Sequence, residues 1–174
     1  DLEPDQVLGL GTILKTLEKA QNDERIKGIY LELDQVSVGF ASAHQLHQAL
    51  LKFRESGKFI VAYGKYFSQG AYYLASTAQP ILLNPSGMID LRGLSTEIPF
   101  FKNLLDKTGI QLQVYYAGQF KSATEPYRLT KMSAQNRLQV HSFLGQIYDQ
   151  FTADLALGRG LSQTFIKDVA NEYQ

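Results

Sequence analysis

At 174 residues the chain is long enough to bury an ordinary core, and its 44% apolar and 20% charged residues are typical of a folded protein. Its 17 basic and 17 acidic residues give a net charge of zero, which argues against a nucleic-acid partner. The absence of cysteine excludes disulfides, thiolate catalysis and cysteine-based zinc sites, and no apolar run is long enough for a membrane span.

The first half of the chain alternates helical and strand patterns. Apolar residues recur at helical spacing over 5–23 and 41–57, and a short apolar helix is predicted at 70–78. Short runs rich in strand formers, apolar on both faces as buried parallel strands are, lie at 28–33, 58–64 and 80–85. These residues predict helices and strands that follow one another regularly.

The second half continues this alternation. Residues 88–98 read as extended, 99–109 as a helix and 110–118 as a further strand, and a terminal helix is predicted over 161–174. Between the strand 110–118 and the terminal helix, a long helix is predicted that has Ser133 as its N-cap. The apolar face expected for that helix consists of Leu138, Phe143, Leu144, Ile147, Tyr148, Phe151 and Leu155.

Regular alternation of strands with helices favours an α/β fold with parallel strands and helical crossovers. We find no internal repeat or linker, so 1–174 is predicted to form a single domain. Because helix-like segments lie at both ends, we expect a fragment of a longer chain. Sites in such sheets lie where strands pass into helices, which directs attention to the loops after 28–33, 58–64 and 110–118.

The loop after 58–64 reads "KYFSQGAYYLAS" and could present a nucleophile at a helix N-terminus. Ser68 is the candidate hydroxyl, but it does not lie in a Gly-x-Ser-x-Gly elbow. We therefore favour a helix-capping role for Ser68. Gly70 could allow close backbone approach, although an ordinary turn glycine is the commoner explanation.

The loop after 110–118 begins "GQFKSATEPY", in which Lys121 is a candidate general base. A free lysine, with a pKa of about 10.4, is a poor base at neutral pH and needs burial to serve as one. Phe120 and Ala123 could supply apolar cover. Glu125 would stabilise the ammonium on a shared helix, but Pro126 biases Glu125 towards an extended conformation, so no helical pair is expected. The alternative is a solvated loop lysine.

No metal or cofactor site is predicted. His44 and His47 lie three residues apart on the helix 41–57, but no third ligand is near, so exposed polar positions are expected for both. His141 is expected to flank the long helix. No glycine-rich phosphate loop or dinucleotide motif occurs, so no cofactor is expected.

Three stretches together carry a resemblance: "YFSQGAYYLAS", "GQFKSATEP" and the "MSA" before the long helix. They resemble the N-terminal domain of long-form (67K-type) bacterial signal peptide peptidase A, or protease IV, of peptidase family S49. The resemblance covers nearly the whole chain and is strongest over 50–135. It implies the Clp protease/crotonase-like fold, in which repeated β-β-α units form a mostly parallel sheet flanked by helices.

The resemblance also implies a serine endopeptidase that degrades cleaved signal peptides with a Ser/Lys dyad. It places the lysine of the dyad on Lys121, with the Ser122 hydroxyl as possible support. The family's serine lies in a C-terminal domain, in a segment of the type S-G-G-Y, and the equivalent stretch here, residues 69–72, reads "QGAY". The loop "VSVGFAS" lacks the paired glycines of an oxyanion hole. By resemblance, this chain is the lysine-bearing half of a two-domain protease and is inactive alone.

Partners and location follow from the same resemblance. The substrate would be signal-peptide remnants. The protein partners would be the chain's own C-terminal domain and further copies in a homo-oligomer, a tetramer in the family, with no nucleic acid. The parent would be held in the bacterial inner membrane with its catalytic domain facing the periplasm, and its anchor would lie upstream of this chain.

Two alternatives stay open. A non-catalytic scaffold or oligomerisation domain of the same fold would also show an incomplete site, and Lys121→Ala would then disturb assembly but spare activity. A crotonase-like acyl-CoA enzyme would need a carboxylate base and a CoA-binding surface, and the sequence shows no specific sign of either.

Overall fold

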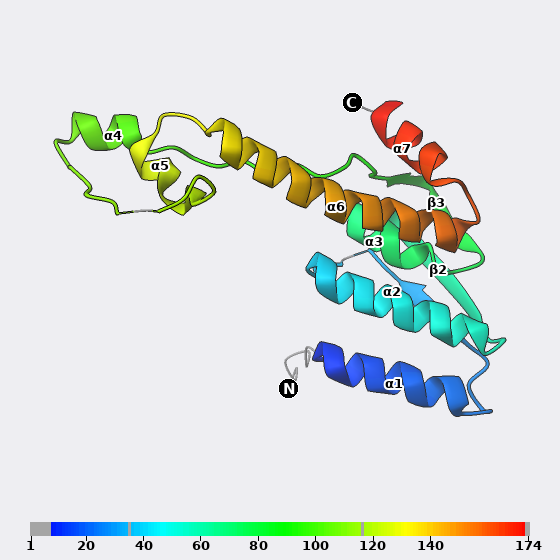
Figure 1. Ribbon diagram of the computed structural model, residues 1–174. Helices are drawn as coiled ribbons and strands as arrows, with labels where there is room; N and C mark the ends of the chain where they lie inside the picture. Colours follow the sequence, from blue (N-terminus) through cyan, green and yellow to red (C-terminus); the bar gives the residue numbers. More distant parts are fainter. Residues whose placement is uncertain (1–7, 35, 116, 173–174) are drawn as a thin grey trace, which may run out of the picture. The chain divides into compact units, whose positions relative to one another are not determined.

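The computed structural model describes residues 8–34, 36–115 and 117–172. Figure 1 shows the course of the chain. Its elements are α1 (Leu10–Asn22), β1 (Gly28–Glu32), α2 (Phe40–Glu55), β2 (Phe59–Phe67), α3 (Gln69–Ala75), β3 (Ile81–Ile89), α4 (Lys102–Lys107), the 3-10 helix η1 (Ser122–Thr124), α5 (Glu125–Arg128), α6 (Ala134–Arg159) and α7 (Gln163–Glu172).

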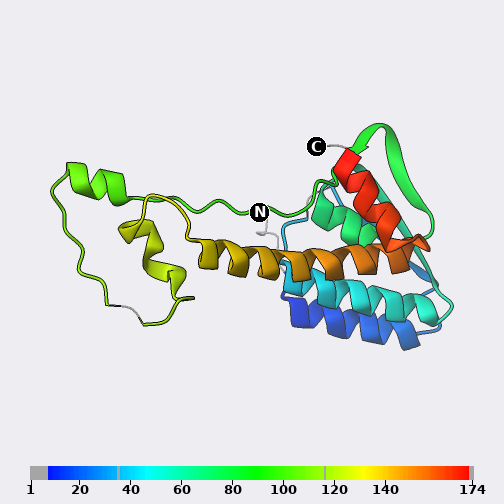
Figure 2. The same cartoon turned by 45° about the horizontal axis from the view of Figure 1, so that its top comes forward.

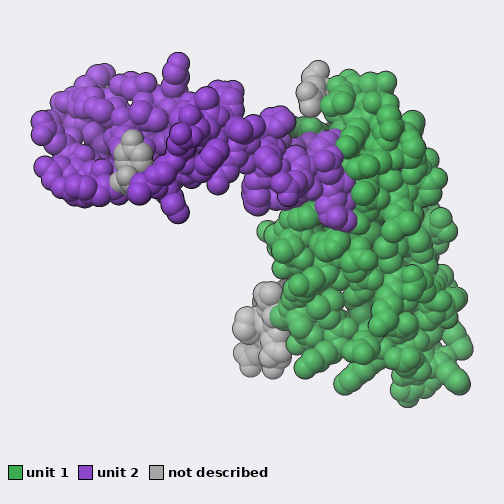
Figure 3. Space-filling view, viewed as in Figure 1, with its two compact units in different colours: residues 1–92, 151–174 green, residues 93–150 purple. Residues whose placement is uncertain are grey.

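The chain divides into two compact units, coloured separately in Figure 3. Unit 1 comprises Asp1–Arg92 and Phe151–Gln174, and unit 2 comprises Gly93–Gln150. That residues 1–174 form a single domain, one half of a two-domain protease, stays a prediction.

Unit 1 is built on a parallel sheet in the order β1-β2-β3. Helix α1 packs on α2, α2 packs on α3, and α3 packs on β2 and β3. Both Figure 1 and Figure 2 show α1, α2 and α3 side by side along the sheet. The expected α/β class, with a parallel sheet flanked by helices, is confirmed.

The core of unit 1 lies between this sheet and its helices. Alternate residues of β2 point into it, so Ile60 is buried while its neighbour Phe59 is 56% exposed. Tyr73 of α3 is fully buried and stacks on Phe151 of α6, with 5.2 Å between ring centroids. Phe40 of α2 contacts both of these rings. The aromatic contacts therefore join α2, α3 and α6 above the sheet.

The opposite face of the sheet is open. Tyr30 of β1, Phe59 of β2 and Leu82 of β3 are each about half exposed or more. The apolar composition of these strands predicts burial on both faces, and within the described residues that prediction is wrong. The helices described here cover only one face, so the large apolar residues of the other face stay exposed.

The described residues of unit 2 form no apolar core. None of its described apolar side chains is buried, whereas Glu125 and Asn136 are. Its large exposed apolar residues include Leu104, Ile110, Leu112, Tyr115, Phe120, Leu138 and Phe143.

The strand predicted over 110–118 is not formed by its described residues. A strand is stable only when its N–H and C=O groups pair with a neighbour, and β-forming side chains alone do not supply that neighbour. The helix predicted over 99–109 is shortened to α4, and of the extended stretch 88–98 only the first two residues lie in a strand, β3.

The long helix begins where the sequence predicts. The Ser133 hydroxyl accepts a hydrogen bond of 3.1 Å from the Asn136 N–H, as an N-cap does. Towards the C-terminal end of α6, Phe151 and Leu155 are buried, but Leu138 and Phe143 near its start are more than 60% exposed.

The two terminal helices are shorter than predicted. The predicted first helix, 5–23, corresponds to α1, and its residues 5–7 lie outside the described part. The predicted last helix, 161–174, corresponds to α7, and its residues 173–174 lie outside it too.

Candidate active site

Lys121 lies on the surface of unit 2 at the start of a short helical turn. Its backbone is not helical (φ −89°, ψ 71°), and it forms the N-cap of η1, which α5 follows directly. Gly118 precedes it with φ +92°, a left-handed conformation that glycine adopts without steric cost. The side chain of Lys121 is exposed. The predicted base is therefore held at a defined turn, with its side chain accessible.

Two hollows of unit 2 border on Lys121. The first, about 500 Å³, is also lined by Tyr115, Ala117, Phe120, Ser122, Ala123, Thr124 and Gln139. The second, about 420 Å³, is also lined by Gly118, Gln119, Glu125, Arg128, Leu129, Ser133 and Gln135.

The first hollow brings together both predicted site residues, Lys121 and Ser122. Phe120 also lines it but is itself 52% exposed, so it does not bury the lysine as the sequence suggests. The dry surroundings that a lysine base requires are therefore not supplied by the described residues of this chain.

Glu125 departs from the conformation expected beside Pro126. Its backbone is right-handed helical (φ −56°, ψ −39°), and it begins α5 instead of being extended. Pro126 is tolerated because the first turn of a helix leaves its N–H groups without helical partners. Lys121 and Glu125 nevertheless form no helical pair, since Lys121 lies outside the helix.

Glu125 forms a hydrogen-bonded cluster that the sequence analysis missed. Its buried carboxylate accepts 2.5 Å and 3.2 Å bonds from the hydroxyl and backbone N–H of Ser133, and a 2.9 Å bond from the Asn136 side chain. Burial tends to raise the pKa of Glu125, but these bonds and the nearby Arg128 outweigh it and lower the pKa below its usual value. The carboxylate thus joins α5 to the first turn of α6 in its charged form.

The sequence predicts one part of this cluster, the N-cap at Ser133. Ser133 was recognised as an N-cap, and a helix N-terminus favours a nearby carboxylate. Nothing in the sequence showed that the carboxylate would come from Glu125, eight residues earlier.

Ser68, the alternative nucleophile, is a helix cap. Its hydroxyl accepts a 3.2 Å bond from the Ala71 N–H at the start of α3, which confirms the favoured interpretation. Gln69, which stands where the resemblance implies a nucleophile in the other domain, accepts a 3.2 Å bond from the Arg92 N–H. Neither side chain is arranged as an activated nucleophile.

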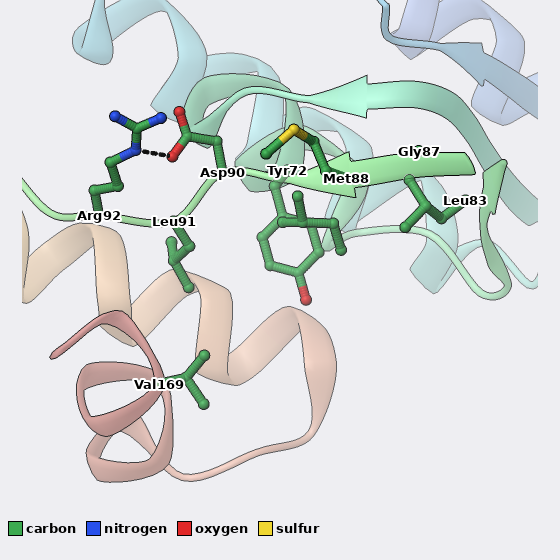
Figure 4. Close-up of a pocket in the computed structure, with 9 residues that line it drawn as sticks. Tyr72, Leu83, Gly87, Met88, Asp90, Leu91, Arg92 and Val169 are labelled. Carbon is green, nitrogen blue, oxygen red and sulfur yellow. Dashed lines mark hydrogen bonds and ion pairs between the residues drawn. The ribbon is translucent and has the colours of Figure 1, made fainter. Parts of the chain in front are cut away.

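A third hollow, about 680 Å³, lies in unit 1 beside β3 and α7. Figure 4 shows the Tyr72 ring and the Leu91 and Val169 side chains around it, with the 2.6 Å ion pair of Asp90 and Arg92 to one side. The other lining residues are Leu83, Gly87, Met88 and Ile89. The lining is mainly apolar, and it holds no histidine, serine or lysine.

The expectation that both histidines of α2 are exposed polar residues is wrong, because His44 is half-buried and His47 is buried. His47 is fully buried and lies 3.1 Å from the Ser76 hydroxyl through Nε2. The Nδ1 atom of His44 is 3.0 Å from an Asp154 carboxylate oxygen, which also accepts a 2.6 Å bond from the Tyr73 hydroxyl. Both histidines therefore point towards neighbouring helices. The periodicity of apolar residues in the sequence does not show that polar partners lie there.

Burial of His47 makes the fold sensitive to acid. It lowers the pKa of His47 to about 4, against about 6.5 in an unfolded chain, so between these values only the unfolded state is protonated. The free energy of unfolding should therefore fall as the pH drops below about 6.5, by about 3 kcal/mol at pH 4 from this group alone.

Urea unfolding followed by circular dichroism between pH 7.5 and 4.5 measures this effect. His47→Leu should lose less stability over that range than the wild type, because leucine has no group to protonate. The Ser76 hydroxyl stays satisfied in this variant through its 2.7 Å bond to the Tyr73 carbonyl. His141→Gln, on the exposed surface of α6, is the matched control and should follow the wild type. Equal pH dependence of His47→Leu and the wild type would contradict the assignment.

Among the described residues, no group of three or more histidine and acidic side chains is placed to hold a metal ion. Nor does any helix in this part of the chain have the length and apolarity needed to cross a bilayer.

Comparison with known proteins gives a consistent result. The sequence profile of Peptidase family S49 matches residues 52–174. The chain is 32% identical to Protease 4 of Haemophilus influenzae over 92% of its length and 35% identical to Protease 4 of Salmonella typhi over 86%. It is 28% identical over 95% of its length to the Serine protease SPPA, chloroplastic, of Arabidopsis thaliana.

These relatives are much longer proteins. The matched part is 26% of the Haemophilus influenzae protein and 24% of each of the other two. The chain therefore spans about a quarter of the length of the curated relatives it matches.

Proposed function

The chain belongs to peptidase family S49, and from this premise we propose that it is the N-terminal, lysine-bearing half of a two-domain serine endopeptidase that degrades cleaved signal peptides. Lys121 is the general base of a Ser/Lys dyad, and the nucleophilic serine lies in the C-terminal domain. The observation that carries the proposal is the position of Lys121, which is exposed at a defined turn, borders two hollows and lines one of them together with Ser122.

The proposed chemistry needs one proton to be moved twice. Neutral Lys121 takes the proton of the serine hydroxyl as the oxygen attacks the peptide carbonyl, and it returns a proton to the leaving amine as the C–N bond breaks. Backbone N–H groups of the other domain stabilise the oxyanion. Water then attacks the acyl-enzyme: Lys121 takes a proton from the water and returns one to the serine oxygen as the ester bond breaks. The Ser122 hydroxyl orients the lysine.

The open surfaces of both units support the proposed partners. A unit needs buried apolar residues to be stable in water alone, and the described part of unit 2 has none and exposes many large ones. The uncovered sheet face of unit 1, with Tyr30, Phe59 and Leu82, requires cover for the same reason. We propose that the chain's own C-terminal domain and further copies in a homo-oligomer supply this cover. They would also remove water from around Lys121.

We further place the parent protein at the bacterial inner membrane, with its catalytic domain facing the periplasm. The support is its similarity to bacterial proteins named Protease 4. If the parent is instead protected from protease added to spheroplasts, that orientation is wrong.

The proposal predicts that this chain alone does not hydrolyse peptides, because the nucleophile is elsewhere. A fluorogenic apolar peptide should be cleaved by the full-length protein but not by residues 1–174 at the same concentration. Adding the separately produced C-terminal domain should restore part of the activity. Cleavage by the chain alone, abolished by Ser68→Ala, would show instead that Ser68 is a nucleophile.

One observation favours a second function. Because Lys121 is exposed and the described residues do not bury it, a non-catalytic scaffold of the same fold accounts for the geometry as well. The two functions differ in what Lys121→Ala does: a scaffold loses assembly and keeps activity, whereas the protease half loses activity and keeps assembly.

A further inference from the structure

The turn that carries Lys121 is fastened at its far end by Glu125. From Ser122 to Arg128 the backbone is continuously helical, and the Glu125 N–H closes η1 by bonding to the Ser122 carbonyl. The Arg128 side chain donates a 3.0 Å bond to the Thr124 hydroxyl across the same turn. Lys121, at the N-cap of η1, therefore starts a short helical segment whose position is set by its neighbours.

Hydrogen bonds and one aromatic contact, the stack of the Tyr127 ring on the Phe101 ring, hold this segment to the rest of unit 2. The Glu125 carboxylate binds Ser133 and Asn136 at the start of α6 through three hydrogen bonds. The Pro126 carbonyl accepts a 2.7 Å bond from the Phe101 N–H. None of the described apolar side chains of unit 2 is buried, and the Phe101 and Tyr127 rings are both exposed, so the hydrogen bonds of Glu125 contribute much of what holds this segment in place.

We propose that Glu125 is a positioning residue for Lys121: its carboxylate locks the η1–α5 segment onto the first turn of α6 and so fixes where the lysine side chain begins. This inference rests on the proposed function of Lys121. It adds to the dyad a residue that touches neither substrate nor serine and acts only through the backbone that carries the base.

The bonding of the carboxylate distinguishes positioning from a charge effect on the lysine. Both oxygens of Glu125 already accept bonds, one from the Ser133 hydroxyl and the other from the Ser133 N–H and the Asn136 amide. The negative charge also lies at the N-terminus of α6, where the helix dipole stabilises it. The charge is thus satisfied locally, and the consequence that reaches Lys121 is geometric.

A base on a long, flexible side chain reaches its target reliably only if the backbone that carries it is held in place. Proton transfer requires the lysine nitrogen within hydrogen-bond reach of the serine oxygen, and a displacement of about 1 Å costs roughly 100-fold in rate. Releasing the segment should therefore lower kcat while leaving substrate binding nearly unchanged.

The test uses Glu125→Gln in the full-length protease. The amide keeps the size of the side chain but places an NH₂ group where the structure has an acceptor facing Ser133 and Asn136. We expect kcat to fall roughly 10–100-fold with KM unchanged. The midpoint of the pH–rate profile should not move. Glu97→Gln, a carboxylate on the exposed surface of the same unit, is the matched control and should behave as wild type.

Asn136→Ala provides a milder second variant if Glu125→Gln lowers the melting temperature too far for assay. It removes one donor of the same cluster and should lower kcat in the same direction. The double variant should be no worse than the more affected single variant, because both changes release the same lock. Fully additive losses would overturn the inference.

The outcomes separate this inference from the proposed function. If Lys121→Ala is inactive while Glu125→Gln and Asn136→Ala are fully active and folded, only the positioning role fails. If Lys121→Ala is active, the proposed function fails whatever Glu125 does. A Glu125→Gln variant whose pH–rate midpoint moves to lower pH with kcat preserved would show a charge effect and overturn the positioning role.

Discussion

Lys121→Ala in the full-length protease is expected to lower kcat by at least about 10⁴-fold, the size of loss found when one member of a catalytic unit is removed. The fold should survive, because the side chain is exposed and its removal leaves no cavity. Without an amine at this position, nothing takes the proton from the attacking serine hydroxyl. Oxyanion stabilisation and substrate binding alone account for any activity that remains.

The measurement is kcat with a fluorogenic apolar peptide, alongside circular dichroism and the oligomeric state in solution. Lys131→Ala, an exposed lysine of the same unit, is the matched control and should retain wild-type activity. Ser122→Ala tests the supporting hydroxyl, and full activity there would remove Ser122 from the site. A Lys121→Ala protein that is active but no longer assembles would establish the scaffold function instead.

Gly158→Ala should destabilise the chain by about 1–3 kcal/mol, the usual cost of forcing an extra group into a packed interior. A Cβ at position 158 of α6 would lie 2.6 Å from the Ser76 carbonyl oxygen at the end of α3 and 2.9 Å from its carbonyl carbon. These are backbone atoms and cannot turn aside as a flexible side chain would. Helices α3 and α6 would have to separate, which disturbs the Tyr73–Phe151 stack.

Gly145 in the same helix provides the control. A Cβ there would meet nothing within 4 Å, so Gly145→Ala should stabilise the chain by about 0.5–1 kcal/mol through helix propensity. Urea unfolding of both variants at pH 7.5 measures the difference. Equal shifts of the same sign would contradict the close approach of α6 to Ser76.

The sheet of unit 1 could be predicted because its strands have the local features that a sheet requires. Residues 28–33 and 58–64 are short, apolar and rich in strand formers, and both were found as β1 and β2 close to the predicted bounds. The stretch 110–118 has the same features and formed no strand in its described residues. The difference is the presence of a neighbouring strand, which no local pattern contains.

The candidate site was predictable in part for the same reason. The loop position of Lys121 and the capping roles of Ser68 and Ser133 depend on residues within a few positions of one another. The cluster around Glu125 depends on a contact between two separate helices, which sequence spacing does not show. His47 likewise has its hydrogen-bond partner, Ser76, at the end of a different helix.

The central claim is that the amine at position 121 accepts the serine proton, and the most direct measurement changes the basicity of that amine. This chain contains no cysteine, so Lys121→Cys introduces within it a single thiol that 2-bromoethylamine converts into a lysine analogue with a thioether in the side chain. The sulfur withdraws electron density and makes the amine less basic than lysine. The pH–rate profile of the alkylated full-length protein is then compared with that of the wild type.

The account predicts an inactive Lys121→Cys protein that regains turnover on alkylation, with the midpoint of its pH–rate profile at lower pH than in the wild type. Wild-type protein treated with the same reagent controls for alkylation elsewhere and should keep its midpoint. Activity of Lys121→Cys before alkylation, or regained activity with an unshifted midpoint, would contradict the assignment of Lys121 as the base.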